Sequence, residues 1–232
     1  NIENPLTLKQ CSSVAHQFGR RRVLSELFGC SGHSMSFEDQ KWIADFHFAL
    51  GITFLCPHLT LYTMRGDAKR DYPPTFSYHQ PYWPYFKLIN DYFARASYVC
   101  SQGRYYADIL LLHPISSAWT TYSPLNGKDP DSPPNRYNDL FVSLLEDLLA
   151  LHWDFDLGDE IIIGRHAGVE DRSVRIGEMK YKVLIVPPSL NWSRKTYELM
   201  WDLVKSGGKV IFVGETPRLI DGEPSEKEWN SL

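Results

Sequence analysis

The 232-residue sequence has no run of about 18–20 apolar residues, the length that a membrane-spanning helix requires. It has no long run of charges of one sign, and its net charge of −4 provides no excess of positive charge to bind nucleic acid or anionic membranes. It also lacks the G-x-G-x-x-G and P-loop motifs that bind phosphate and the G-x-S-x-G motif of serine hydrolases. These absences disfavour nucleotide-dependent and serine-hydrolase chemistry, and neither nucleic acid nor a membrane is expected as a partner.

The four cysteines and eight histidines form no metal-binding pattern. There is no C-x-x-C and no H-x-x-x-H, so the sequence does not predict a zinc site. Cys30 and His33 lie three residues apart, a spacing that does not by itself make a catalytic dyad. Cys56 and Cys100 lie in apolar segments and are expected to be small buried side chains. The cysteines indicate neither an oxidising nor a reducing compartment.

Composition predicts a folded protein, with 43% hydrophobic and 22% charged residues. The chain does not begin with methionine, and its first residues resemble the middle of a domain. We interpret it as a fragment, which leaves its localisation open between cytoplasm and periplasm or secretion.

The first region, residues 1–103, is expected to alternate strands and helices. A strand carries Glu26 into a glycine-rich loop, and Ser36 is a plausible N-cap, with Asp39 completing a capping-box variant. The apolar strand at 52–56 shows no alternation, which predicts that both of its faces are covered. The predicted elements are strand 22–27, helix 36–50, strand 52–56, an irregular segment 57–83 and helix 86–102.

The second region, residues 104–232, repeats the same strand–helix alternation, which favours a doubly wound parallel sheet. The predicted strands are 107–113, 154–157, 181–186 and 209–213, and the predicted helices are 139–152 and 193–206, with a loop over 120–134. Residues 160–166 fit either a strand or a helix, and a short helix capped by Asp159 is favoured. Asp154, Asp156 and Asp159 lack the rest of a calcium loop, which favours a solvated turn. Ser116, Ser117 and Ser189 belong to no catalytic motif, so this region is expected to be structural.

Glu26 is the main catalytic candidate. In a (β/α)8 barrel the functional groups lie where strands end, and a carboxylate there is suited to glycosidic-bond chemistry. The alternative is an ion pair with one of the arginines at positions 20–22. His58 and Tyr62 follow the next strand, where imidazole and an aromatic face suit a sugar, although an ordinary loop role stays open. Tyr78, Tyr82 and Trp83 could wall a sugar subsite or simply pack their loop.

The segments 11–19 and 23–29 resemble the late barrel strands of bacterial glycoside hydrolases, most closely the α-L-rhamnosidase-type glycoside hydrolase family 106. The resemblance continues through residues 37–42, 51–54, the loop around 72–74 and 81–83, and 92–98. The second region resembles the glutamine-amidotransferase-like, flavodoxin-like domain that follows the barrel in several such hydrolases, including the family 42 β-galactosidases.

The resemblance implies the C-terminal strands of a (β/α)8 barrel followed by a flavodoxin-like domain. Glu26 would then be a catalytic carboxylate at the end of about the seventh strand. Such enzymes use two carboxylates, and the second would lie outside this chain, so the chain alone is expected to be inactive. The expected sugar-binding residues are His58, Tyr62, Trp83 and His33, and the family can use calcium. The rivals are a β-galactosidase-like hydrolase and a non-catalytic carbohydrate-binding or assembly module, with oligomer contacts through the second region.

Overall fold

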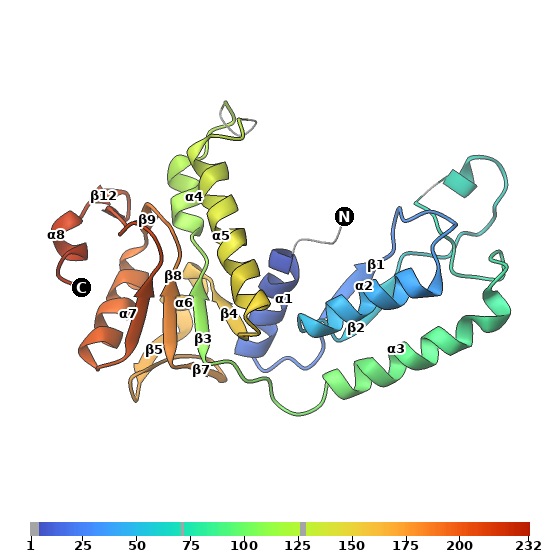
Figure 1. Cartoon of the computed structure of the whole chain (residues 1–232), viewed down its shortest axis with the longest axis horizontal. Helices are drawn as coiled ribbons and strands as arrows, with labels where there is room; N and C mark the ends of the chain where they lie inside the picture. The colour runs from blue at the N-terminus through green and yellow to red at the C-terminus, as the bar shows by residue number, and fades with distance from the viewer. Residues whose placement is uncertain (1–4, 71, 126–128) are drawn as a thin grey trace. The chain divides into compact units, whose positions relative to one another are not determined.

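The computed structural model describes residues 5–70, 72–125 and 129–232. The chain divides into two compact units (Figure 1). Among the described residues, the first unit contains 5–15 and 20–104, and the second contains 16–19 and 105–232. Each unit has its own hydrophobic core.

The first unit contains a short parallel β-α-β arrangement. Its elements are α1 (Pro5–Gln17, whose last two residues belong to the second unit), β1 (Leu24–Leu27), α2 (Phe37–Ala49), β2 (Phe54–Pro57), the 3-10 helices η1 (Gly66–Arg70) and η2 (Trp83–Tyr85), and α3 (Phe86–Cys100). Strands β1 and β2 pair in parallel with Glu26 opposite Cys56. The predicted order of strand, helix, strand, irregular segment and helix is confirmed.

Helix α2 begins where the sequence predicts. The Ser36 side chain accepts a hydrogen bond from the Asp39 backbone N–H, and the Asp39 carboxylate accepts one from the Ser36 N–H. Gly51, at a φ of +91°, follows the end of the helix in a conformation that favours glycine. Both ends of this helix are thus set by local sequence.

The core of the first unit lies between β1, α2 and α3. Along α3 the buried side chains Phe86, Ile89 and Phe93 recur at helical spacing. The buried cluster consists of Leu27, Phe28, Met35, Ala44, Phe48, Phe76, Phe86, Ile89 and Phe93. These aromatic and aliphatic side chains hold the turn after β1 against the helices.

Several burial predictions for the first unit are wrong. Strand β2 is not covered on both faces: Phe54, Cys56 and Pro57 are exposed. Side chains project from the faces of a sheet, and in the described residues β2 belongs to a sheet of two strands with an open face. All four cysteines are exposed, including Cys100, which is the last residue of α3 and lies beyond the buried stripe of that helix. Residues 11–17, which resembled part of the late barrel strands, are helical in α1.

The second unit is built on a four-stranded sheet in the order β10-β8-β3-β4, with every neighbouring pair parallel. A three-stranded antiparallel sheet, β5-β6-β7, and a small sheet of β9, β11 and β12 are added to it. The strands are β3 (Ile109–Leu112), β4 (Phe155–Gly158), β5 (Ala167–Glu170), β6 (Ser173–Ile176), β7 (Met179–Tyr181), β8 (Val183–Val186), β9 (Asn191–Trp192), β10 (Lys209–Phe212), β11 (Leu219–Ile220) and β12 (Glu223–Pro224).

Helices cover both faces of the parallel sheet, with α7 on one side and α5 on the other (Figure 1). Alternate residues of β3 serve the two faces: Leu110 and Leu112 join the cluster that includes Tyr197, Met200 and Leu203 of α7. The helices of this unit are α4 (Ile115–Thr121), α5 (Pro133–Ala150), α6 (Glu160–His166), α7 (Arg194–Lys205) and α8 (Glu226–Trp229). The predicted parallel sheet is therefore present.

Local details of the second unit differ from prediction. Helix α4 occupies the start of the predicted loop 120–134, whose residues 126–128 lie outside the described residues. Helix α5 begins at Pro133 rather than at 139, because proline suits the first turn of a helix. The single strand predicted over 181–186 is two strands, and the antiparallel sheet before it was not predicted. Asp156 does not lie in a solvated turn: it is fully buried in β4.

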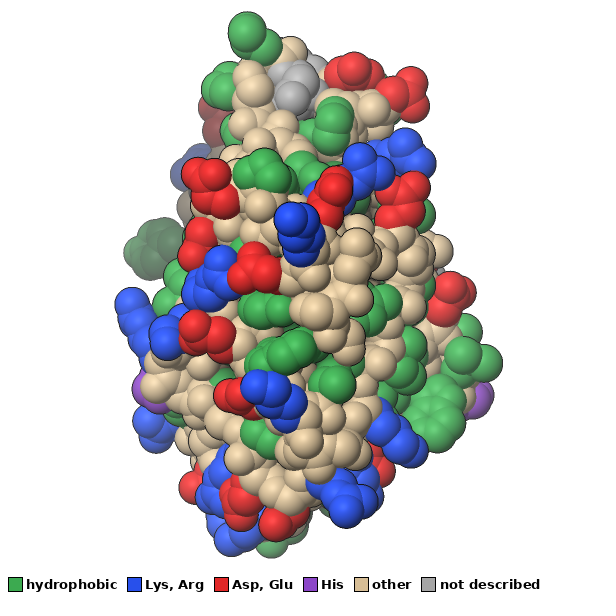
Figure 2. Space-filling model, turned by 90° about the vertical axis from the view of Figure 1, so that its left-hand side faces the viewer, with side chains coloured by type: hydrophobic (Ala, Val, Ile, Leu, Met, Phe, Trp, Pro, Cys, Tyr) green, Lys and Arg blue, Asp and Glu red, His purple; other side chains and the backbone are tan. Residues whose placement is uncertain are grey.

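On the face shown in Figure 2, lysine and arginine side chains are interspersed with aspartate and glutamate. This mixture agrees with the small net charge of −4. Of the helices in the described part of the chain, none combines the length and the apolar content required to cross a bilayer.

Candidate functional site

Glu26 is the next-to-last residue of β1, and its carboxylate is 64% exposed. Its neighbour Leu27 points the other way and is buried in the core, as the alternation of a strand dictates. The ion pairs with the arginines at 20–22 that the structural alternative requires do not form among the described residues. The carboxylate is therefore open to a ligand.

His58 lies next to Glu26, directly after β2. Its Nε2 is 3.7 Å from Oε1 of Glu26. Its backbone N–H donates a 2.7 Å hydrogen bond to the Leu27 carbonyl, which extends the β1–β2 pairing by one residue. Parallel pairing thus brings together two side chains that are 32 positions apart in the sequence.

The Nδ1 atom of His58 is buried and finds no hydrogen-bond partner among the described residues. An orphaned buried N–H is less tolerated than an acceptor with an unused lone pair. The neutral ring therefore favours the tautomer with its proton on Nε2, which faces Glu26. In this form His58 is a donor directed toward the carboxylate or toward a substrate oxygen beside it.

The loop after β1 holds two non-glycine residues in the left-handed region. Phe28 has a φ of +69° and Cys30 a φ of +60°. Phe28 is kept in this conformation by its burial in the core, where its ring lies 5.7 Å from that of Phe76. Such conformations are uncommon and gather at functional sites.

The long segment between β2 and α3 is anchored to its surroundings. Gly32 N–H donates to the Pro73 carbonyl at 3.2 Å, and Phe76 N–H donates to the Leu59 carbonyl at 3.0 Å. Thr75 is fully buried, and its hydroxyl oxygen accepts from the Leu61 N–H at 3.0 Å. We call the described residues of this segment, within 59–85, the rim of the Glu26–His58 pair.

His33 joins two parts of this rim. Its Nε2 lies 2.9 Å from the Lys69 carbonyl, to which it donates, and the Gln80 amide nitrogen lies 3.4 Å from its Nδ1. Both ring nitrogens are thus engaged with the protein itself. Gln80 is a contact that sequence reasoning missed, since no motif marks it.

The aromatic residues named from the sequence lie in different environments. Tyr62 is 97% exposed, and Trp83 stacks on Phe86 at 5.4 Å between ring centroids. Tyr82 packs against the core cluster beside Phe37. The aromatic ring that contacts His58 is Tyr72, edge to face at 5.7 Å, and sequence reasoning did not single it out.

Glu160, at the carboxyl end of β4, is 5% exposed and accepts hydrogen bonds from two separate segments. Its Oε1 accepts from the Ser116 N–H at 2.9 Å, and its Oε2 accepts from the Ser193 N–H at 2.7 Å. The predicted Asp159 cap is also present, bonding the N–H groups of Ile161 and Ile162. The edge of the sheet where α/β folds bind ligands is here occupied by the protein's own carboxylate.

Ser117 and Ser189 are also committed to internal bonds. The Ser117 hydroxyl donates to the Asn191 carbonyl at 2.8 Å and accepts from the Asn191 N–H at 2.9 Å. The Ser189 hydroxyl donates to the Pro187 carbonyl and accepts from the Trp192 indole N–H, both at 2.8 Å. These groups hold the small β9 sheet to its neighbours.

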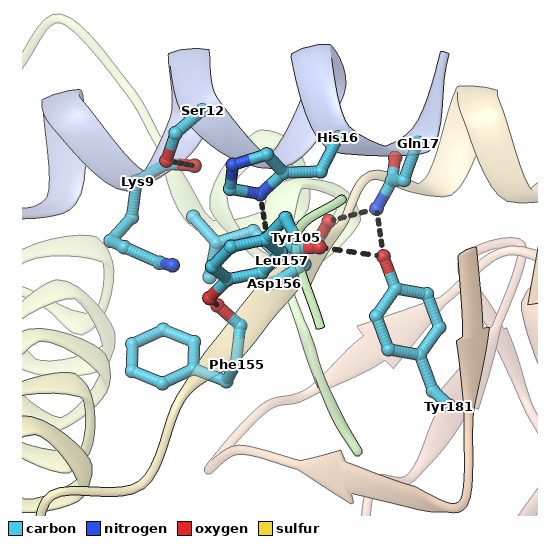
Figure 3. Close-up of polar contacts among 9 residues, drawn as sticks. All are labelled: Lys9, Ser12, His16, Gln17, Tyr105, Phe155, Asp156, Leu157 and Tyr181. Carbon is cyan, nitrogen blue, oxygen red and sulfur yellow. Dashed lines mark hydrogen bonds and ion pairs between the residues drawn. The ribbon is translucent and has the colours of Figure 1, made fainter. Parts of the chain in front are cut away.

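A buried polar network surrounds Asp156 (Figure 3). Its carboxylate accepts from the Tyr181 hydroxyl and from Nδ1 of His16, both at 2.8 Å. Burial, reinforced by the Asp156 charge, raises the pKa of Tyr181 and of Tyr105, whose ring stacks on His16. Gln17 donates to the Leu157 carbonyl at 2.9 Å. The network ties residues 16–17 to β4.

Among the described residues, no three His, Cys, Asp or Glu side chains come together in an arrangement that could hold a metal ion.

The family model described as alpha-L-rhamnosidase matches residues 3–231. The chain is 29% identical over 222 residues to a Formosa agariphila protein named "Putative beta-glucuronidase", covering 90% of this chain and 16% of that protein. A rhamnosidase structure from Novosphingobium sp. PP1Y superposes with a TM-score of 0.69 at 18% identity, covering 98% of this chain and 21% of that one.

A catalytic mutant of a GH42 β-galactosidase from G. stearothermophilus superposes with a TM-score of 0.60 at 12% identity. That match covers 97% of this chain and 32% of the other. The chain thus spans a sixth of its curated relative and between a fifth and a third of these structures. The structural likenesses establish a mixed α/β fold with parallel sheets.

Proposed function

The chain belongs to the α-L-rhamnosidase family, glycoside hydrolase family 106, and from this premise we propose that it is part of an enzyme that hydrolyses O-glycosidic bonds. Its substrate is a carbohydrate, and an α-L-rhamnoside is the first candidate. The observation that carries the proposal is the exposed Glu26 carboxylate at the end of a parallel strand, with Nε2 of His58 3.7 Å away.

Glu26 is one carboxylate of the pair that glycosidic-bond hydrolysis uses. It acts as general base on water if the enzyme inverts configuration, or as nucleophile if it retains it. Its 64% exposure leaves room for a substrate or a water molecule at Oε1. His58 donates from Nε2 to a sugar hydroxyl or to Glu26 itself, and so orients one against the other.

In this proposal β1 and β2 are late strands of a (β/α)8 barrel. Parallel strands are normally covered on both faces, whereas Leu24 is 54% and Phe54 41% exposed. Further strands of the same barrel would cover these side chains and carry the second carboxylate. The described chain alone is then inactive.

We further propose that the second unit is a flavodoxin-like domain with a supporting role. Numbered along the chain, the strands of its parallel sheet follow the order 2-1-3-4, which is typical of that fold. Because Glu160 at this edge is committed to internal hydrogen bonds, we assign the domain a structural role, such as oligomer contacts.

The test is a comparison of wild type with Glu26→Gln in the full-length protein that contains these residues. The panel of aryl glycosides includes α-L-rhamnoside, β-D-glucuronide and β-D-galactoside. Loss of a catalytic carboxylate lowers turnover by roughly 10³-fold or more without a change in Tm.

Exposed Glu198 on α7 offers a matched control, Glu198→Gln, that should leave both turnover and Tm unaltered. Turnover retained by Glu26→Gln would refute the catalytic role. Absence of turnover on every glycoside would favour a non-catalytic carbohydrate-binding or assembly module.

A further inference from the structure

We propose that Tyr72 forms the aromatic wall of the substrate site beside Glu26 and His58, where it contacts the apolar C–H face of a sugar ring. The inference rests on the proposed function and adds a substrate-contacting residue to it. The aromatic positions named from the sequence for contact with a sugar were Tyr62, Tyr78, Tyr82 and Trp83.

The first support is the position of the ring. Tyr72 meets the His58 imidazole edge to face at 5.7 Å between centroids, and Nε2 of the same imidazole lies 3.7 Å from Oε1 of Glu26. Tyr72 is nevertheless 58% exposed. More than half of the residue is therefore open to solvent, and its ring adjoins the imidazole that faces the carboxylate.

The second support is the backbone that presents Tyr72. The following residue, Pro73, accepts a hydrogen bond from Gly32 in the loop after β1, and Pro74 and Thr75 are buried. Tyr72 itself has a φ of +46°, a conformation that aromatic residues rarely adopt. An exposed aromatic residue in such a conformation on an anchored segment is typical of a functional position.

The third support is the packing of two other aromatic residues named from the sequence, Trp83 and Tyr62. Trp83 uses a face of its indole to stack on Phe86, with 26° between the ring planes, and so packs its loop onto the core. Tyr62 is 97% exposed, and none of the described rings contacts it. In the described part of the chain neither ring is paired with the His58 imidazole, whereas the Tyr72 ring is.

The chemistry fits a carbohydrate. A pyranose presents hydroxyl groups at its edge and C–H groups on its faces, so it requires polar partners on one side and an apolar surface on the other. Glu26 and His58 supply the polar partners, and the exposed tyrosine ring supplies the apolar surface. A wall of this kind binds the ground state and the transition state alike, so its loss raises KM more than it lowers kcat.

The experiment measures kcat and KM of the full-length protein on the aryl glycoside that wild type turns over. Tyr72→Ala should raise KM by roughly 10-fold or more with kcat changed less than threefold, in line with the loss of one aromatic contact. Tyr72→Phe keeps the ring and should retain the wild-type KM. The matched control Tyr98→Ala, at an exposed tyrosine of α3, should leave KM unchanged.

Folding is checked by Tm, and Tyr72→Leu replaces Tyr72→Ala if the latter unfolds. If Tyr72→Ala or Tyr72→Leu keeps the wild-type KM while Glu26→Gln abolishes turnover, the proposed role of Tyr72 is refuted and the proposed function stands. If wild type hydrolyses no glycoside, binding of the free monosaccharides is measured by saturation-transfer NMR. Binding weakened by loss of the Tyr72 ring then supports the wall in a non-catalytic protein, and no binding overturns both proposals.

Discussion

Glu160→Gln tests whether one buried carboxylate holds the second unit together. In the wild type each carboxylate oxygen accepts a backbone N–H, from Ser116 at 2.9 Å and from Ser193 at 2.7 Å. Glutamine preserves the shape and one acceptor oxygen, but its NH₂ group faces the other N–H. One buried donor is left without an acceptor, and the N-terminus of α7 loses an anion.

The size of the effect follows from these two losses. An unsatisfied buried donor costs about 1–3 kcal/mol, and removal of an anion from a helix N-terminus costs about 0.3–1 kcal/mol. We therefore expect Glu160→Gln to lower the free energy of unfolding by about 2–4 kcal/mol. Glu160→Ala loses both acceptors and should cost more.

The assay is urea denaturation of the 232-residue chain followed by circular dichroism. The control is Glu198→Gln, which removes an exposed carboxylate paired with Lys195 and should change stability by less than about 1 kcal/mol. A Glu160→Gln variant within about 0.5 kcal/mol of wild type would contradict the reasoning, because it would mean that both N–H groups find other acceptors.

Two further predictions concern single side chains. Burial lowers the pKa of His113, against a smaller opposite effect of the Asp159 charge, so unfolding takes up a proton and Tm should fall as pH drops below about 6.5. His113→Leu should reduce this dependence of Tm on pH, whereas the control His152→Asn, at an exposed histidine, should not. If Tm falls equally steeply with pH in wild type and in His113→Leu, His113 is not the source of the dependence. Ser36→Ala removes the hydroxyl that caps α2 and should lower the free energy of unfolding, measured with denaturant, by about 1 kcal/mol. Ser36→Thr keeps a hydroxyl and should retain most of that stability. An alanine variant as stable as wild type would show that the capping box contributes nothing.

Local sequence was sufficient where local bonds set the structure. Ser36 with Asp39 and Asp159 before Glu160 predict helix starts that the structure contains, since capping requires only residues within three or four positions. The alternation of strands and helices in the second region likewise predicts a parallel sheet, and β3, β8 and β10 pair in parallel as predicted.

The sequence failed where partners are distant. The buried position of Asp156 depends on Tyr181 and His16, which lie 25 and 140 positions away, and an Asp-rich segment alone is typical of a turn. The exposure of Cys56 depends on which parts of the chain pack against the face of β2, and the composition of the strand does not determine that.

For the candidate site, the sequence by itself determined which residue types stand at strand ends: Glu26 after one apolar run and His58 after the next. Only the tertiary structure decided that Oε1 and Nε2 lie 3.7 Å apart, that both nitrogens of His33 are engaged in the rim, and that Tyr72 is the ring beside His58. The physical reason is that strand position follows from local hydrophobicity, whereas the meeting of side chains depends on parallel register and on the hydrogen bonds that anchor a long loop.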